Sequence, residues 1–401
     1  MKNVTAIMGI TLMYMMIVFP AKLYVIKVPL LFLLFIIQFR KVRVSQPVAF
    51  LVGAMCLSTL WGVVVGTFKS TSSPLADFTI GFLWPVASLF VLLPLLEKKK
   101  DFILFAKYLF YGHAFVVLYD MAFVLSVIIG FSMINLYPEV ETPFSFYGFT
   151  SRLNFDDNLN FITFTTPLYL FVWLSLYDIK VNRFLQTIIL LLNVFLLVVS
   201  GRRSLMLTFV LAPFFVILFK NVFPKQLGKN VKISFTVLII IVASALSYYY
   251  IIEPDNFDGY VNTFTKAFDS DEEPIKYNQA RILWSHFNNN FLFGEGAGVE
   301  LPRGNGSTGI RFELSYLHHF TTGGIFGGLL YICGLVGIFL YGFKMAKKRD
   351  ETLMLFFSIA FLFSLIAHGT NPVLSSFDSM IPIFLGYAQI NALYYYKTYI
   401  S

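Results

Sequence analysis

Charged residues are scarce in this sequence: only 13% of its 401 residues are Asp, Glu, Lys or Arg, about half the share that is usual in a soluble domain. Hydrophobic residues make up 57%, the mean hydropathy is +0.74, and the apolar runs are too long for core helices of a soluble protein. The composition excludes a soluble globular protein and indicates a polytopic protein of the lipid bilayer. The first apolar run starts near Met1 without a small-residue cleavage site, so we expect a retained span.

Cysteine is nearly absent, and the common metal and cofactor motifs are missing. Cys56 and Cys333 both lie inside apolar segments, which argues against a disulfide framework, a thiol metal site or an iron–sulfur cluster. No zinc-ligand spacing, Asp-x-Asp pair, Walker motif or Ser-His-Asp arrangement is recognisable. We therefore expect no metal and no cofactor. The net charge of +8 is explained by the excess of Lys and Arg that cytoplasmic loops of membrane proteins carry, so no nucleic-acid partner is expected.

Twelve apolar segments approach the roughly 20 residues that a membrane-spanning helix needs. They are residues 4–20, 27–39, 47–67, 76–96, 103–131, 159–177, 183–200, 204–220, 232–252, 315–342, 352–369 and 376–396. Because the second is short and the fifth is long, eleven or thirteen spans are alternatives. The predicted fold class is an all-α polytopic membrane protein, with residues 1–401 as a single integral membrane domain.

The charges between these segments predict the topology. With the N-terminus in the cytoplasm, the cytoplasmic loops carry mostly Lys and Arg, whereas the opposite loops carry more acidic than basic residues. The flipped topology would reverse this positive-inside bias, so both termini are expected in the cytoplasm. Two outer loops, 133–158 and 253–314, mix aromatic, acidic and amide residues. Such a mixture suits either sugar binding or well-packed polar loops.

Two adjacent arginines, Arg202 and Arg203, separate two apolar segments in the stretch VVSGRRSLML. The topology puts them at the outer surface, where positive charge is disfavoured. A guanidinium group, with its planar fork of donors and no accessible neutral form, is suited to holding an anion. The alternative is that the neighbouring spans are misassigned and the pair is an ordinary cytoplasmic anchor.

The longer outer loop contains a helix-like stretch, YNQARILWSHFNNN, followed by FLFGEGAG. Arg281 and Trp284 lie one turn apart on this stretch and therefore on one face. The three glycines permit positive-φ backbone and predict a compact turn that brings the loop back to the membrane. A dinucleotide site is rejected, because no strand precedes the glycines and no helix of a Rossmann unit follows them.

Polar residues also gather at the start of the tenth predicted span, in RFELSYLHHF. Glu313 at the membrane interface is a candidate general base for a hydroxyl group, with a solvated loop carboxylate as the alternative. Four neighbours are candidate substrate-binding residues: Arg311, Tyr316, His318 and His319. Each histidine has a structural, hydrogen-bonded role as its alternative.

Two further patterns lie inside predicted spans. The glycine run GGIFGG, together with Gly334 and Gly337, predicts close packing of the tenth span against another helix. Asp120 lies within the fifth span, where carboxylates are functional candidates, and His113 lies two turns away as a candidate partner. A purely structural polar pair is the alternative.

In their order along the chain, these motifs resemble the superfamily of bacterial O-antigen polymerases and O-antigen ligases. The resemblance rests on the Ser-Gly-Arg-Arg turn, the Arg-x-x-Trp helix, Leu-Phe-Gly-x-Gly-x-Gly and the Ser-Tyr-Leu start of a Gly-rich span. It covers about residues 198–340. Ligases carry a His-Asn pair where this sequence has Glu313 and Leu314, and this departure favours a polymerase.

The resemblance implies a C-type glycosyltransferase (GT-C) fold in the bacterial inner membrane, with a metal-independent active site facing the periplasm. Its substrates would be undecaprenyl-diphosphate-linked glycans, and the product O-antigen or a related surface polysaccharide. Arg203, with Arg202 beside it, and Arg281 would hold the diphosphate, while Glu313 would activate the acceptor hydroxyl. A chain-length regulator and a flippase of the same pathway would be partners.

Two other functions remain as alternatives at this stage. The first is a ligase that transfers finished glycan to lipid A core, which the residues at Glu313 and Leu314 disfavour. The second is a flippase or other transporter of lipid-linked oligosaccharides. A transporter would be expected to distribute ionisable residues through its spans, whereas here they concentrate at the outer interface, with Asp120 as the main exception.

Overall fold

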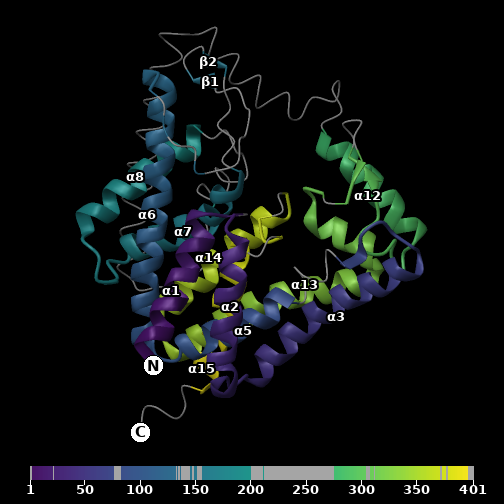
Figure 1. Cartoon of the computed structure of the whole chain (residues 1–401), viewed down its shortest axis with the longest axis horizontal. Coiled ribbons are helices and arrows are strands. Elements are labelled where there is room, and N and C mark those ends of the chain that lie inside the picture. Colours follow the sequence, from purple (N-terminus) through teal and green to yellow (C-terminus); the bar gives the residue numbers. More distant parts are fainter. Residues whose placement is uncertain are drawn as a thin grey trace.

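The computed structural model shows a mostly helical chain (Figure 1). It describes residues 2–20, 22–75, 83–131, 133, 136, 145–146, 149–150, 156–199, 211, 275–303, 308–310, 312–370, 373–375 and 378–395. The α-helices are α1 Lys2–Val18, α2 Tyr24–Gln38, α3 Gln46–Phe68, α5 Trp84–Leu95, α6 Lys99–Ile129, α7 Asp156–Leu174, α8 Arg183–Val199, α12 Ile275–Asn289, α13 Ser315–Arg349, α14 Thr352–His368 and α15 Ile381–Tyr395. The short elements are the 3₁₀ turns η1 Phe39–Lys41 and η3 Asp378–Met380, and two antiparallel hairpins, β1 Ser145–Phe146 with β2 Phe149–Thr150 and β3 Leu301–Pro302 with β4 Thr308–Gly309.

Within the described residues, three helices are long and apolar enough to cross a membrane: α3, α6 over Lys99–Ser126, and α13. Shorter apolar helices cover Val4–Val18, Phe161–Leu174, Arg183–Leu196 and Thr352–His368. The prediction of a helical protein with membrane-suited helices is confirmed at this level. The predicted spans at 204–220 and 232–252 lie outside the described residues, apart from Leu211.

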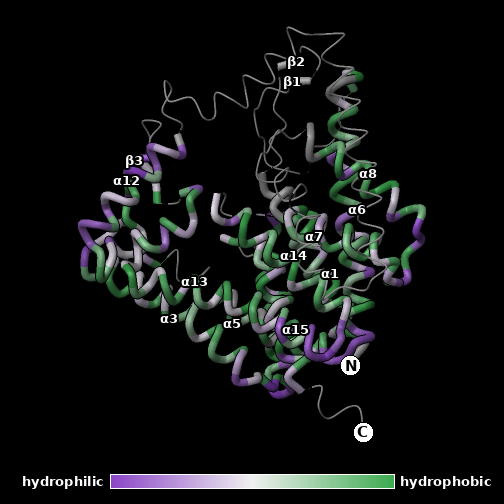
Figure 2. The backbone as a smooth tube through the Cα atoms, turned by 180° about the vertical axis from the view of Figure 1, so that it is seen from behind, coloured by the Kyte–Doolittle hydropathy of each residue, from purple (hydrophilic) through white to green (hydrophobic). Residues whose placement is uncertain are grey.

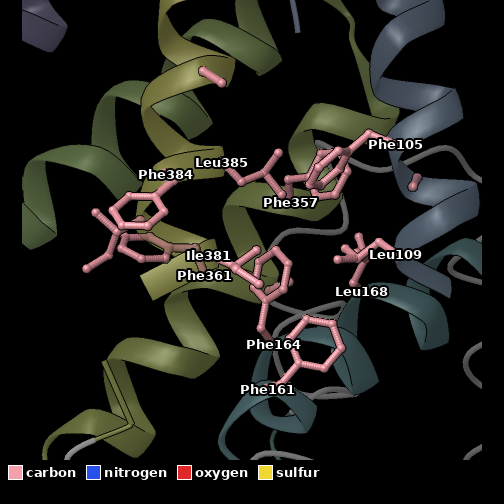
Figure 3. Close-up of a cluster of buried hydrophobic side chains, with 14 of the residues drawn as sticks. Phe105, Leu109, Phe161, Phe164, Leu168, Phe357, Phe361, Ile381, Phe384 and Leu385 are labelled. Carbon is pink, nitrogen blue, oxygen red and sulfur yellow. The ribbon is translucent and has the colours of Figure 1, made fainter. Parts of the chain in front are cut away.

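Apolar side chains of α6, α7, α14 and α15 meet in the central core (Figure 3). Phe164 of α7 stacks on Phe357 of α14 with ring centroids 6.4 Å apart, and both side chains are buried. The long apolar runs thus bury their phenylalanines against one another, as close-packed interiors require. His113, the candidate partner of Asp120, does not hydrogen-bond to it: His113 Nδ1 lies 2.9 Å from the Thr165 hydroxyl of α7, and Nε2 has no hydrogen-bond partner among the described residues.

Helices α3 and α13 run side by side and extend away from this core, with α12 beside their outer ends (Figure 1). Small residues bring the two helices close: the Ser58 hydroxyl donates to the Gly327 carbonyl at 2.7 Å. Further along, Gly334 faces Met55 and Gly337 faces Leu51, so the pair is antiparallel. The predicted close packing of this Gly-rich span is confirmed.

The predicted tenth span differs from its expectation in two ways. It extends to Arg349 rather than ending near residue 342, and it is not one continuous helix. Gly324 has φ 63° and ψ −166°, which interrupts the helix between its first turns and its long apolar part. The glycine run therefore supplies a break as well as a packing surface.

Polar contacts join helix ends at both extremities of the structure. At one extremity, Lys99 pairs with Glu351 at 2.9 Å, where α6 and α14 begin. At the other extremity, Lys276 of α12 donates to the Thr370 carbonyl at 2.9 Å, just past α14. Hydrophilic segments are visible at α12 and β3, and again near the N-terminus and α15 (Figure 2).

Candidate functional site

Helix α12 forms where the sequence predicts it and has two distinct faces. Leu283 and Phe287 are buried, and Leu283 packs in a small core with Leu301 and Phe312. The Thr321 hydroxyl of α13 donates to the Leu283 carbonyl at 3.0 Å, which fixes α12 on the first turns of α13. Arg281 and Trp284 lie on an adjoining, exposed face, so the prediction that they share a face is confirmed.

The glycine turn after α12 enters the break in α13. Gly294, Gly296 and Gly298 all have positive φ, between 78° and 93°. The amides of Glu295 and Gly296 donate to the carbonyls of Thr321 and Thr322, at 2.8 and 2.9 Å, just before Gly324. The predicted compact turn is confirmed, and it supplies hydrogen-bond partners for the carbonyls that the broken helix leaves without one.

The same turn also binds the other side of the break and helix α3. The Ile325 amide, just after the break, donates to the Phe291 carbonyl at 2.7 Å. The Ala297 amide donates to the Gly62 carbonyl of α3 at 2.8 Å. Buried backbone groups need such internal partners, because they have no access to water. The turn therefore fixes the exposed face of α12 relative to α3 and α13.

A polar cluster clamps the turn to the ends of α3 and α12. Lys69 Nζ donates to the Asn290 side chain at 2.7 Å and to the Gly294 carbonyl at 2.9 Å, and lies 3.2 Å from Glu295 Oε2. Glu295 Oε1 lies 2.8 Å from His286 Nδ1. Burial raises the pKa of Glu295, but the hydrogen bonds from His286 and Lys69 outweigh it, so the pKa lies below its usual 4.5.

This cluster makes a testable contribution to stability. A carboxylate whose pKa is lowered on folding stabilises the fold above its unfolded-state pKa, and the stabilisation is lost as the pH falls through the lowered value. We expect Glu295→Gln to lower Tm at pH 7 by about 2–4 °C, and the difference from wild type to shrink below pH 4.5. Thermal unfolding in detergent between pH 7 and pH 3 measures both effects.

Asp178→Asn is the matched control for this prediction. Asp178 also pairs with a lysine, Lys180, at 2.7 Å, but its side chain is 63% exposed. Exposed ion pairs contribute little to stability. If Asp178→Asn and Glu295→Gln lower Tm equally, the clamp does not stabilise the turn.

Glu313 lies at the start of α13 and is about half exposed. Its Oε2 atom is 3.1 Å from Nζ of Lys276, the second residue of α12. The same ammonium group donates to the Thr370 carbonyl beyond α14. Three elements therefore meet at this carboxylate, which remains accessible to a substrate from solvent.

A buried group of aromatic and histidine side chains lies near the start of α13. His319 stacks on the ring of Tyr331 with centroids 3.6 Å apart, and the Tyr331 hydroxyl lies 2.7 Å from His368 Nε2. The Leu374 amide donates to His368 Nδ1 at 3.2 Å, so a neutral His368 carries its hydrogen on Nε2. The Tyr316 hydroxyl donates to the Leu365 carbonyl at 2.6 Å.

These contacts show which of the candidate residues the structure brings together. His318 lies against Phe312 and next to His319. For His319 and Tyr316, the structure shows packing and hydrogen-bonded roles inside the protein. Tyr331 and His368, which complete this group, were missed by the sequence reasoning, because nothing near them in the sequence marks them.

Three candidate residues, Arg202, Arg203 and Arg311, lie outside the described residues. Arg281 lies more than one turn along α12 from Lys276, the partner of Glu313. Within the described residues, no group of three His, Cys, Asp or Glu side chains is arranged to hold a metal ion. The described residues therefore offer two groups to a ligand: the exposed guanidinium of Arg281 and the half-exposed carboxylate of Glu313. The glycine turn and α13 hold the elements that carry them in place.

Two comparisons of the sequence with known proteins gave no matches. A scan of the sequence against models of protein families found none that fits, and a search of curated proteins also found no similar sequence. The resemblance of the motifs to the O-antigen polymerase and ligase superfamily therefore stays a prediction.

Proposed function

We propose that the protein is a membrane glycosyltransferase that polymerises lipid-diphosphate-linked oligosaccharide repeat units into O-antigen or a related surface polysaccharide. The proposal includes the GT-C fold with about twelve spans, both termini in the cytoplasm, and an active site on the periplasmic face of the bacterial inner membrane. Undecaprenyl-diphosphate-linked glycans are the substrates, and a chain-length regulator and a flippase are its pathway partners.

One observation carries the proposal: Arg281 and Trp284 share an exposed face of α12, and this helix is fixed beside the half-exposed carboxylate of Glu313. A guanidinium group is suited to a diphosphate, and an exposed indole offers an apolar face to a sugar ring. The many internal hydrogen bonds of the glycine turn favour preorganisation, which electrostatic stabilisation of a leaving group requires.

In the proposed reaction, an acceptor hydroxyl oxygen attacks the anomeric carbon of the donor glycan and forms the new glycosidic bond. The carboxylate of Glu313 takes the hydroxyl proton, after the substrate displaces Lys276 from it. The bond between the anomeric carbon and the diphosphate oxygen breaks, and its electron pair leaves with the lipid diphosphate. Arg281, together with Arg203, stabilises the charge that develops there.

Replacement of Arg281 tests this assignment. Loss of one donor to developing charge reduces the rate by about 10²–10³-fold, so Arg281→Ala should remove the product ladder at reaction times where wild type gives one. Arg281→Lys keeps the charge but loses the fork of donors, and should retain an intermediate rate. The purified protein in detergent is incubated with the lipid-diphosphate repeat unit of its host, without metal or lipid A core, and the products are resolved by size.

Three outcomes would contradict the proposal in different ways. If Arg281→Ala forms the product ladder at the normal rate, Arg281 does not stabilise the leaving diphosphate. No ladder from folded wild type, followed by transfer when lipid A core is added, would make the protein a ligase. Movement of the intact lipid-linked unit across proteoliposomes without any new bond would make it a transporter.

A further inference from the structure

The exposed face of α12 extends beyond the two residues already discussed. Tyr277 and Trp284 are 59% and 55% exposed, and Arg281 and Asn288 are also exposed. At 100° per residue these four side chains fall within roughly 60° of one another around the helix axis, over a length of about 16 Å. We call this set the α12 stripe.

A different side of α12 is its packing face. Gln279, Leu283 and Phe287 are all buried, and at 100° per residue their mean direction lies about 130° from that of the stripe. Phe287 contacts Phe320 of α13 with ring centroids 5.6 Å apart. Since the apolar side of the helix is already occupied by the protein, the stripe is what α12 presents outward.

The stripe differs in chemistry from the apolar turn that follows it. Exposed side chains without any polar group follow the end of α12, at Phe291, Leu292 and Phe293. Trp61 of α3 connects Phe293 to Phe326 of α13, with ring centroids 5.7 and 5.3 Å from Trp61. This apolar turn is therefore continuous with the long apolar helices, whereas the stripe alternates aromatic rings with a cation and an amide.

We propose that the α12 stripe is a binding track for the sugar units of the glycan, an inference that rests on the proposed function. The rings of Tyr277 and Trp284 offer apolar faces to the CH groups of sugar rings, and the Asn288 amide donates to and accepts from hydroxyls. Arg281 between the two rings anchors an anionic group of the same ligand. The track is longer than one sugar ring, so it engages more than one unit.

Two neighbouring asparagines give a matched test of the track. Asn288 and Asn289 are both exposed near the end of α12, but Asn289 lies about 100° further around the helix and so off the stripe. The probe is the host repeat-unit oligosaccharide freed of lipid and diphosphate, and its binding to purified full-length protein is measured by calorimetry. We expect Tyr277→Ala and Asn288→Ala each to weaken binding about 3- to 10-fold, and Asn289→Ala to leave it unchanged.

Other outcomes overturn the track without deciding the proposed function. Equal effects of Asn288→Ala and Asn289→Ala would show that the stripe is not the contact. Binding of sugar-free undecaprenyl diphosphate, with the same dependence on Tyr277 and Asn288 but no binding of the oligosaccharide, would make the stripe a lipid-carrier site. The product ladder is assayed separately. A ladder without oligosaccharide binding would support the polymerase and contradict the binding track. Oligosaccharide binding without a ladder would support the binding track and contradict the polymerase.

Discussion

Glu313→Gln is expected to reduce chain growth by about 10²–10⁴-fold, the usual contribution of a positioned general base. An amide of nearly the same shape cannot take the acceptor proton. The geometry supports this role, because the carboxylate lies at the start of α13, is 46% exposed, and is held 3.1 Å from Lys276. The initial rate of polymer formation with the lipid-linked repeat unit measures the effect.

Lys276→Gln separates catalysis from structure in this experiment. It removes the same ion pair as Glu313→Gln but keeps the carboxylate. An exposed pair contributes at most about 1 kcal/mol to stability, so both variants should fold. We expect Lys276→Gln to retain most of the activity. Equal losses in the two variants would mean that the ion pair, and not proton transfer, is what the reaction needs.

Gly296→Ala is expected to destabilise the protein by about 2–5 kcal/mol, from left-handed backbone strain together with overpacking. Gly296 has φ 93°, and an added Cβ would overlap the backbone of Gly66 in α3. Neither backbone can move away, since the turn is bonded to α3 at Gly62 and to α13 at Thr322. Thermal unfolding in detergent should show a lower Tm than that of wild type.

Gly53→Ala in α3, the helix that Gly296 contacts, is the control. A Cβ at Gly53 meets no atom within 4 Å, and alanine favours helix over glycine by up to about 1 kcal/mol. We expect no loss of stability in this variant. If Gly296→Ala is as stable as Gly53→Ala, the turn does not occupy the break in α13 as described.

The features that the sequence predicted are those encoded locally. The helix around Arg281 and Trp284 follows from apolar residues repeating at helical spacing, and its exposed face follows from the same spacing. The glycines of the turn were recognisable because few other residues adopt positive φ. The start of α13 at Ser315 also agrees with the predicted start of the tenth span.

The features that the sequence did not predict depend on contacts between distant segments. The break at Gly324 needs the turn at Phe291 to bond its exposed backbone, and a glycine run alone is equally typical of an unbroken packed helix. His113 has Thr165 of another helix as its partner instead of Asp120 on its own. The pairing of Glu313 with Lys276 likewise joins elements that no local pattern connects.

The insertion of the glycine turn between α3 and α13 has a consequence for biosynthesis. The Thr71 hydroxyl beyond α3 donates to the Ala297 carbonyl, a partner 226 residues later in the chain. At about 5–20 residues per second, the ribosome needs roughly 10–45 s to reach that partner. During this interval the side of α3 that carries Gly62 and Gly66 lacks the turn that covers it in the folded protein.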